Sequence, residues 1–391
     1  MRSFFKALPF VASVLAVRPF LNEADTGIDE IFGDVANGTL IPLENIVGLP
    51  DFEWAARRYL NATAYTYYRN GAGGEWSYRN NLEVYQRYTL RPRVMKNIIN
   101  IEDSLETNIL GFPFSAPIFI SPCARGSYGH PEAEAGLVKA AASEKILYIP
   151  SLFASLTIEE IGALKSPPIN STNETPQVTM QQVYVDSDLV AAQKLFNRVE
   201  AAGGKAIIYT VDSAGDGNRH RAVRYGVGSA DSSYSLITWE TFHTLQNLTS
   251  LPIIPKGIMT VEDAQDAVEN GCKAIILSNH GGRQVDGAPS SLEVALEIYQ
   301  KAPEVFKQTE VYADGGVRYG TDVLKLLSLG VKAVGVGRPM MYANVYGEEG
   351  VTKAIQLLKK EIALDAANLG IGDLKKIDAS YVNWNRNNWY S

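Results

Sequence analysis

One short segment of the chain carries a histidine and an arginine at a spacing that suits acid–base chemistry: Ser278-Asn279-His280-Gly281-Gly282-Arg283-Gln284. The His280 imidazole can accept a proton near neutral pH. Arg283, three residues on, can bind a carboxylate through two parallel hydrogen bonds. Asp212 could orient His280 and stabilise its imidazolium, and Tyr184 could offer a hydroxyl to a substrate oxygen. Together these residue types predict proton abstraction from a substrate that carries a carboxylate.

The elements that must position these residues follow a regular rhythm from Ala116 onward. Short β-rich runs alternate with stretches of helical apolar spacing, such as 132–143, 188–202, 261–270, 291–301 and 321–329, and a final helix is expected over 347–368. Alternating strands and helices indicate a parallel sheet, and eight units indicate an α/β fold of the closed (β/α)8 TIM barrel type. A doubly wound sheet of about six strands is the alternative. The expected strands are 116–121, 146–150, 178–184, 206–212, 252–256, 274–278, 310–314 and 333–337.

The ends of these strands collect the reactive residue types. Barrel enzymes build their sites at the carboxyl ends of the strands. Taken singly, an aspartate or tyrosine there is better explained by a structural hydrogen bond, and the coincidence of several on one rim is what indicates catalysis. The residues at the eight ends are Pro122, Ser151, Tyr184, Asp212, Lys256, His280, Asp314 and Gly337-Arg338.

Two glycine-rich loops follow the seventh and eighth strands, at 314–321 and 335–339. In barrels these two loops are the usual phosphate site, because glycine lets the backbone come close to the anion. Arg318 and Arg338 add planar donors that match a phosphate. Two glycine turns with surface arginines are the alternative, but their occurrence in tandem after these strands favours a phosphate site.

The N-terminus has a different character. Residues 1–6 carry two positive side chains and residues 7–17 form an apolar run, which predicts a signal peptide over 1–17. A disordered apolar tail is the alternative. Sequons at Asn37, Asn61, Asn170, Asn173 and Asn247 agree with a glycosylated protein of the secretory pathway or the extracellular space. We expect an N-terminal arm and helical extension over 18–115, with a helix from Asp51 to about Tyr68, and the barrel over 116–391.

Composition excludes several kinds of partner. A net charge of −7 argues against nucleic acid, which needs a basic face. The apolar run at 7–17 is too short to span a bilayer. The four histidines do not pair at metal-ligand spacing and no Cys-x-x-Cys occurs, so no metal site is expected.

From about Asp51 to Leu374 the chain resembles the FMN-dependent 2-hydroxy acid oxidases and dehydrogenases. The segment 278–284 is similar to the family's signature, and 251–257 resembles its lysine strand. The resemblance implies that His280 is the base, with Asp212 as its partner and Tyr184 facing the substrate hydroxyl. It implies that Tyr67 and Arg283 bind the substrate carboxylate and that Arg219 is a second arginine that binds the substrate. It implies that the FMN is held by Pro122, Ala124, Ser151, Gln182, Thr210, Lys256, Ser278, Asp314, Gly316, Arg318, Gly337 and Arg338.

The resemblance also implies the reaction: oxidation of a small-to-medium L-2-hydroxy acid to the 2-oxo acid, with oxygen as electron acceptor and hydrogen peroxide as product. A dehydrogenase with another acceptor, an FMN-dependent isomerase and a non-catalytic flavin-binding protein are the alternatives. We expect a homo-oligomer with no haem-binding domain before the barrel. Two departures bear on the substrate. Phe153 replaces the tryptophan of plant glycolate oxidases, and the segment from Arg219 to Trp239 is short, which predicts a roomier pocket.

Overall fold

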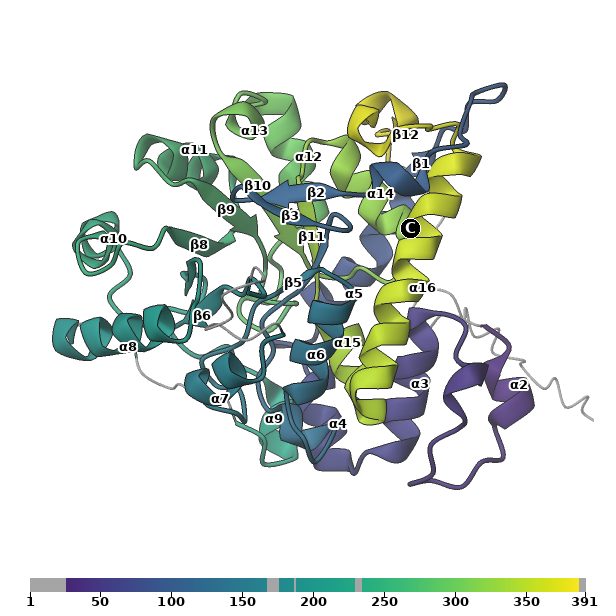
Figure 1. Cartoon of the computed structure of the whole chain (residues 1–391), viewed down its shortest axis with the longest axis horizontal. Helices are drawn as coiled ribbons and strands as arrows, with labels where there is room; N and C mark the ends of the chain where they lie inside the picture. Colours follow the sequence, from purple (N-terminus) through teal and green to yellow (C-terminus); the bar gives the residue numbers. More distant parts are fainter. Residues whose placement is uncertain (1–25, 167–175, 186–187, 229–233, 387–391) are drawn as a thin grey trace, which may run out of the picture.

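The computed structural model describes residues 26–166, 176–185, 188–228 and 234–386. The predicted signal peptide and the sequons at Asn170 and Asn173 lie outside these ranges. Eight parallel strands form one sheet in the order β5-β4-β11-β10-β9-β8-β7-β6, with all eight predicted strands present (Figure 1). Their bounds are β4 Ile118–Ile120, β5 Leu147–Tyr148, β6 Gln181–Val183, β7 Ile207–Thr210, β8 Ile253–Ile258, β9 Ala274–Leu277, β10 Glu310–Asp314 and β11 Ala333–Val336.

A bridge between β5 and β6 closes the sheet into the barrel. Tyr148 pairs in parallel with Thr179, just before β6, and the amide of Gln182 donates to the carbonyl of Pro150 over 2.9 Å. The sequence therefore forms the predicted (β/α)8 barrel and not a doubly wound sheet. The strands are buried on both faces, as strands between a filled interior and an outer ring of helices must be.

The helices cover the outside of the barrel, and their apolar faces contact the strands (Figure 1). The long α16 runs beside α6 and reaches α3 of the N-terminal extension. Most predicted helices begin and end within a residue of the observed bounds, and α6 begins three residues later. The helices after successive strands are α6 Ala135–Ser143, α7 Ile158–Ala163, α8 Leu189–Ala201, α9 His220–Arg224, α10 Trp239–Gln246, α11 Val261–Glu269, α12 Ser291–Lys301, α13 Val305–Gln308, α14 Gly320–Ser328, α15 Arg338–Ala343 and α16 Gly347–Asn368.

The single helix predicted from Asp51 to Tyr68 is wrong. The structure has two helices there, α3 Leu49–Tyr59 and α4 Ala62–Arg69. Asn61 separates them, because its side chain accepts a hydrogen bond from the amide of Ala64 over 2.9 Å and so caps a new helix. Asp51 is not a cap: it lies inside the first turn of α3, where its carboxylate accepts from the amide of Val47 over 2.8 Å.

The remaining elements of the extension include a hairpin that packs against the barrel interior and a strand that pairs with one near the C-terminus. A hairpin of β2 Thr107–Ile109 and β3 Phe112–Phe114 packs Ile109 and Phe114 against the barrel interior. Strand β1 Thr89–Leu90 pairs with β12 Val382–Asn383, and α2 Ile28–Phe32 and α5 Trp76–Glu83 complete the extension. One core cluster runs from the extension into the barrel, so the two predicted segments share their packing.

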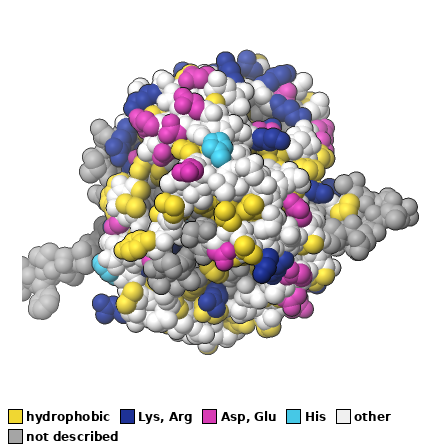
Figure 2. Space-filling view, turned by 90° about the vertical axis from the view of Figure 1, so that its left-hand side faces the viewer, with side chains coloured by type: hydrophobic (Ala, Val, Ile, Leu, Met, Phe, Trp, Pro, Cys, Tyr) yellow, Lys and Arg dark blue, Asp and Glu magenta, His cyan; other side chains and the backbone are white. Residues whose placement is uncertain are grey.

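The described surface carries charged side chains of both signs. On the face that carries α8 and α10, acidic and basic side chains are interspersed among apolar ones (Figure 2). In the ranges that the structure describes, no helix is long and apolar enough to cross a membrane, and no three His, Cys, Asp or Glu side chains are grouped to hold a metal ion.

Candidate active site

His280 lies on the loop after β9 in an unusual backbone conformation. Its φ is 58°, and Gly281 and Gly282 follow at 65° and 74°, so three successive residues are left-handed. Both glycines are required by close packing as well. A Cβ at Gly281 would lie 2.6 Å from Nη1 of Arg338, and one at Gly282 would lie 2.5 Å from the amide nitrogen of Tyr78. The glycines therefore let the loop turn sharply and aim the imidazole inward.

Asp212, just after β7, holds the imidazole in one orientation. Its Oδ1 lies 2.9 Å from Nδ1 of His280, and both side chains are about nine-tenths buried. Burial lowers the pKa of His280 to about 4, helped by Arg283 and Lys256 and opposed by Asp212. Burial raises the pKa of Asp212, but His280, Lys256 and Arg283 together outweigh burial and keep that pKa below its ordinary value. A neutral imidazole that donates from Nδ1 leaves the lone pair of Nε2 free, which is the state a base requires.

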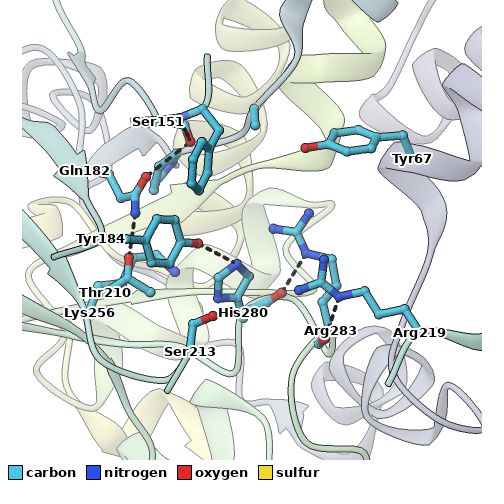
Figure 3. Close-up of a pocket in the computed structure, with 13 residues that line it drawn as sticks. Tyr67, Ser151, Gln182, Tyr184, Thr210, Ser213, Arg219, Lys256, His280 and Arg283 are labelled. Atoms are coloured by element: carbon cyan, nitrogen blue, oxygen red, sulfur yellow. Dashed lines mark hydrogen bonds between the residues drawn. The ribbon is translucent and has the colours of Figure 1, made fainter. Parts of the chain in front are cut away.

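Nε2 of His280 faces the pocket beside the hydroxyl of Tyr184, 3.5 Å away (Figure 3). Burial, and after it the charge of Asp212, raises the pKa of Tyr184, so its phenol stays protonated. Phe153 stacks on the Tyr184 ring at a centroid distance of 5.3 Å. The pocket therefore presents one acceptor and one hydroxyl together, beside an aromatic wall.

Arg219, Arg283 and Tyr67 occupy the opposite side of this pocket (Figure 3). The two arginines are tied together, because Nε of Arg219 donates to the carbonyl of Arg283 over 2.9 Å. Nε of Arg283 in turn donates to the carbonyl of His280 over 3.1 Å. Burial, and then the charge of Arg283, lowers the pKa of Arg219 to about 10. Two partly buried cations side by side favour binding of an anion, and a carboxylate matches their planar donors.

A row of polar side chains lines the remaining wall of the pocket, opposite the two arginines (Figure 3). The amide of Gln182 donates to Oγ1 of Thr210 over 2.9 Å and accepts from Oγ of Ser151 over 3.2 Å. Nζ of Lys256 donates to Oγ of Ser278 over 2.7 Å. Pro122 and Ala124 add apolar contacts to the lining. Donors and acceptors along one edge with apolar contact beside them suit the polar edge and flat face of a flavin ring.

A second pocket adjoins the first and shares Pro122, Lys256, His280 and Arg283 with it. The two glycine loops line it, together with Arg318. Gly316 has φ 80°, and a Cβ there would lie 1.8 Å from the carbonyl oxygen of Asn81, so no larger residue fits. Exposed backbone next to cationic side chains is the chemistry that holds a phosphate, so this pocket fits the phosphate end of FMN.

Arg338 lines the same pocket, but much of its donor capacity is already used. Its guanidinium donates to the carbonyls of Tyr68 and Asn70 over 2.8 Å each and to that of Gly281 over 3.0 Å. Arg318 lies 3.6 Å from Glu53. Arg338 therefore joins the phosphate pocket to α4 and to the His280 loop, in addition to any contact with a phosphate.

The structure brings the predicted site residues together. Each lines one of the two pockets except Asp212 and Ser278, and these hydrogen bond to His280 and Lys256. Sequence reasoning gave no role to Gln284, although it ends the signature segment. Its amide donates to Oγ of Ser213 over 2.8 Å and accepts from Nη2 of Arg219 over 2.6 Å.

The pair of Asn81 and Asn279 was also missed. Their amides exchange two hydrogen bonds of 2.8 Å, which fixes the residue before His280. The two asparagines lie 198 positions apart. No local pattern in the sequence could have joined them.

Known proteins share this architecture. The sequence matches the family described as FMN-dependent dehydrogenase over residues 56–236 and 229–384. It is 34% identical to L-lactate dehydrogenase (cytochrome) of Wickerhamomyces anomalus, covering 86% of this chain and 61% of that protein. It is 33% identical to glycolate oxidase 3 of Oryza sativa subsp. indica, covering 87% and 97%. Its fold matches the flavin-binding domain of baker's yeast flavocytochrome b2 with a TM-score of 0.81 and 34% identity, covering 88% of each chain.

The geometry and the comparisons agree on the cofactor and on the reaction class. The first pocket combines a neutral base with a carboxylate site, and the second suits a phosphate-bearing flavin. The chain belongs to the FMN-dependent 2-hydroxy acid oxidases and dehydrogenases.

Proposed function

We propose that this enzyme oxidises an L-2-hydroxy acid of small to medium size to the 2-oxo acid and passes the electrons to oxygen, so that acid and oxygen yield 2-oxo acid and hydrogen peroxide. The observation that carries the proposal is the buried, neutral His280 facing two partly buried arginines across one pocket. The L configuration follows from the family resemblance.

The side chains divide the work as follows. Arg283 and Arg219 bind the carboxylate, which sets the hydroxyl of the substrate toward Nε2 of His280 and Tyr184. His280 takes a proton from the substrate, and Asp212 stabilises the imidazolium that results. Bound FMN supplies the acceptor for the two electrons that leave the substrate. Lys256 is placed to stabilise negative charge at the polar edge of that site.

The choice of oxygen is tested by comparing acceptors. The purified protein is supplied with L-lactate in air, and oxygen consumption and peroxide are both measured. One peroxide for each 2-oxo acid supports the proposal. Rapid anaerobic bleaching of the flavin with slow reoxidation by air, but fast reoxidation by ferricyanide, would instead assign a dehydrogenase.

We propose in addition that acids with larger side chains are used at least as well as glycolate. Phe153 is smaller than a tryptophan, and it stacks on Tyr184, which lies across the pocket from the two arginines (Figure 3). The extra room therefore falls beside the side chain of the substrate and not at its carboxylate. The measurement is kcat/KM for glycolate, lactate, 2-hydroxyoctanoate and mandelate. A maximum at glycolate with a steady decrease along the series would contradict the proposal.

We propose that the enzyme enters the secretory pathway and associates with copies of itself. The sequons at Asn37, Asn61 and Asn247 lie in the described ranges and are exposed, as glycan acceptors must be. Val94, Met95 and Ile99 are 80%, 98% and 83% exposed on one loop, which favours association. N-terminal sequencing, glycosidase treatment and sedimentation of protein from a eukaryotic host test this. An intact Met1, no glycan and a monomer would overturn it.

A further inference from the structure

One turn of the N-terminal extension contacts both loops that approach the substrate carboxylate. The turn, residues 71–75, follows α4 directly. The amide of Ala72 donates to the carbonyl of Gly282 over 2.8 Å, and the amide of Gly73 donates to the carbonyl of Asn218 over 2.7 Å. These two bonds join segments that come after β9 and after β7.

The two carbonyls belong to the residues that immediately precede the substrate arginines. Gly282 precedes Arg283, and Asn218 precedes Arg219. The third carboxylate-facing residue, Tyr67, lies on α4 itself. A shift of the turn would therefore move the backbone of both arginines relative to Tyr67.

Glu75 holds this turn through its charge. Its carboxylate accepts from Nε and Nη2 of Arg221 over 2.8 and 3.1 Å, and from Nη1 of Arg69 over 3.1 Å. It also accepts from the amide of Gly71 over 3.2 Å, which closes the turn on itself. Burial raises the pKa of Glu75, but the hydrogen bond from Arg221 and the charge of Arg69 outweigh burial, and the pKa falls to about 2. Glu75 is therefore ionised at any pH at which the enzyme works.

Arg221 connects Glu75 to the substrate site. It lies two residues after Arg219, in the first turn of α9. Pinning Arg221 to Glu75 fixes where α9 begins, and with it the backbone of Arg219. Asp286 supports the turn from the other loop, because its carboxylate accepts from the amides of Gly74 and Ser77 over 2.8 and 2.9 Å.

We propose that Glu75 is a positioning residue for the substrate carboxylate, acting on Arg219 through the bidentate ion pair with Arg221. The inference rests on the proposed function, since it assigns the carboxylate to Arg219 and Arg283. Glu75 touches neither the substrate pocket nor the flavin pocket. Its removal therefore weakens substrate binding and leaves the proton transfer of a bound substrate intact.

The test is Glu75→Gln in the holoenzyme, with Arg221→Gln as a second variant that removes the partially exposed partner. We expect KM for L-lactate and Kd for oxalate, followed by the change in flavin absorbance, to rise about 10-fold to 100-fold, the usual loss when a hydrogen bond to a charged group is weakened. The rate of flavin reduction at saturating lactate stays within about twofold of the wild type, because His280 and Asp212 are undisturbed. Arg221→Lys, which keeps the charge and loses the paired geometry, gives intermediate values.

The matched control is Glu159→Gln. Glu159 accepts from Nε and Nη2 of Arg198 over 2.7 and 2.8 Å, the same bidentate pairing, but on the exposed side of α7 and α8. The control should leave KM and Kd unchanged. The proposal is overturned if Arg221→Gln leaves the Kd for oxalate unchanged, or if Glu159→Gln raises that Kd as much as the Arg221 variant does. Both outcomes can be measured even if Glu75→Gln fails to fold. Oxalate binding needs no turnover, so a wild type that binds oxalate but is reduced by no 2-hydroxy acid would refute the proposed function alone.

Discussion

Asp212→Asn tests the acid–base pair most directly, because the amide keeps the size of the side chain and removes its charge. Oδ1 of Asp212 lies 2.9 Å from Nδ1 of His280, and the two side chains are only 8% and 10% exposed. When His280 takes the proton it becomes a buried cation, and the nearby Arg283 and Lys256 oppose that charge. Two unit charges about 4 Å apart attract by about 4 kcal/mol at an effective dielectric constant of about 20.

Loss of that attraction raises the barrier by the same amount, so flavin reduction should slow by about 10³-fold. The assay is anaerobic stopped-flow bleaching of the flavin at saturating 2-hydroxy acid, after FMN content has been shown to match the wild type. Asp263→Asn, on the exposed surface of α11, is the control for the substitution itself. A decrease of less than about tenfold would refute the reasoning, because it would correspond to under about 1.4 kcal/mol of stabilisation.

Three further predictions concern the same pocket. His280→Gln should retain FMN and slow its reduction by about 10²–10⁴-fold, the usual value of a positioned base; normal reduction in this variant would show that another residue accepts the proton. Burial lowers the pKa of His280 to about 4, so kcat/KM should stay constant as the pH falls through 6. It should decrease only as the pH approaches about 4, where the imidazole becomes protonated. An acid limb at the ordinary imidazole pKa of about 6.5 would contradict a buried neutral base. Phe153→Trp should lower kcat/KM for mandelate relative to glycolate by about tenfold, since added volume is felt by the larger side chain; an unchanged ratio would place the substrate side chain elsewhere.

Much of the fold could be predicted because the barrel repeats one local pattern. Most strands are short runs rich in apolar residues, such as Ala274–Leu277, and the helices that follow have one apolar face. The error at Asp51 shows where local reasoning fails. An aspartate before an apolar run resembles an N-cap, but Pro50 already lies in the first turn of α3, and the side chain of Asp51 is turned to the amide of Val47.

The site was predictable to the extent that its residues lie just after strand ends, as His280 and Asp212 do. The prediction that Lys256 ends its strand is wrong, because β8 continues to Ile258. The supporting contacts were not, because they join distant parts of the chain. Arg338 was assigned to a phosphate from its loop, and the structure shows that it also binds the carbonyls of Tyr68 and Asn70, some 270 residues away. Every residue has a backbone carbonyl, so the sequence does not indicate which carbonyls accept such hydrogen bonds. These contacts can be identified only from the fold.

The closure between β5 and β6 has a consequence for local opening of the barrel. Backbone pairing there amounts to the bridge at Tyr148 and a few amides, and side chains continue it at the rim, where Gln182 accepts from Oγ of Ser151 and from the amide of Leu152 over 3.2 and 3.1 Å. A seam with few backbone bonds opens at low free energy cost. Since the predicted flavin contacts Ser151 and Gln182 lie on either side of this seam, a bound ring would span it and favour the closed form. The backbone amides of 148, 149, 151, 152 and 180–182 should then exchange with deuterium faster in the apoprotein than in the holoenzyme, so that the cofactor itself stabilises the closed barrel.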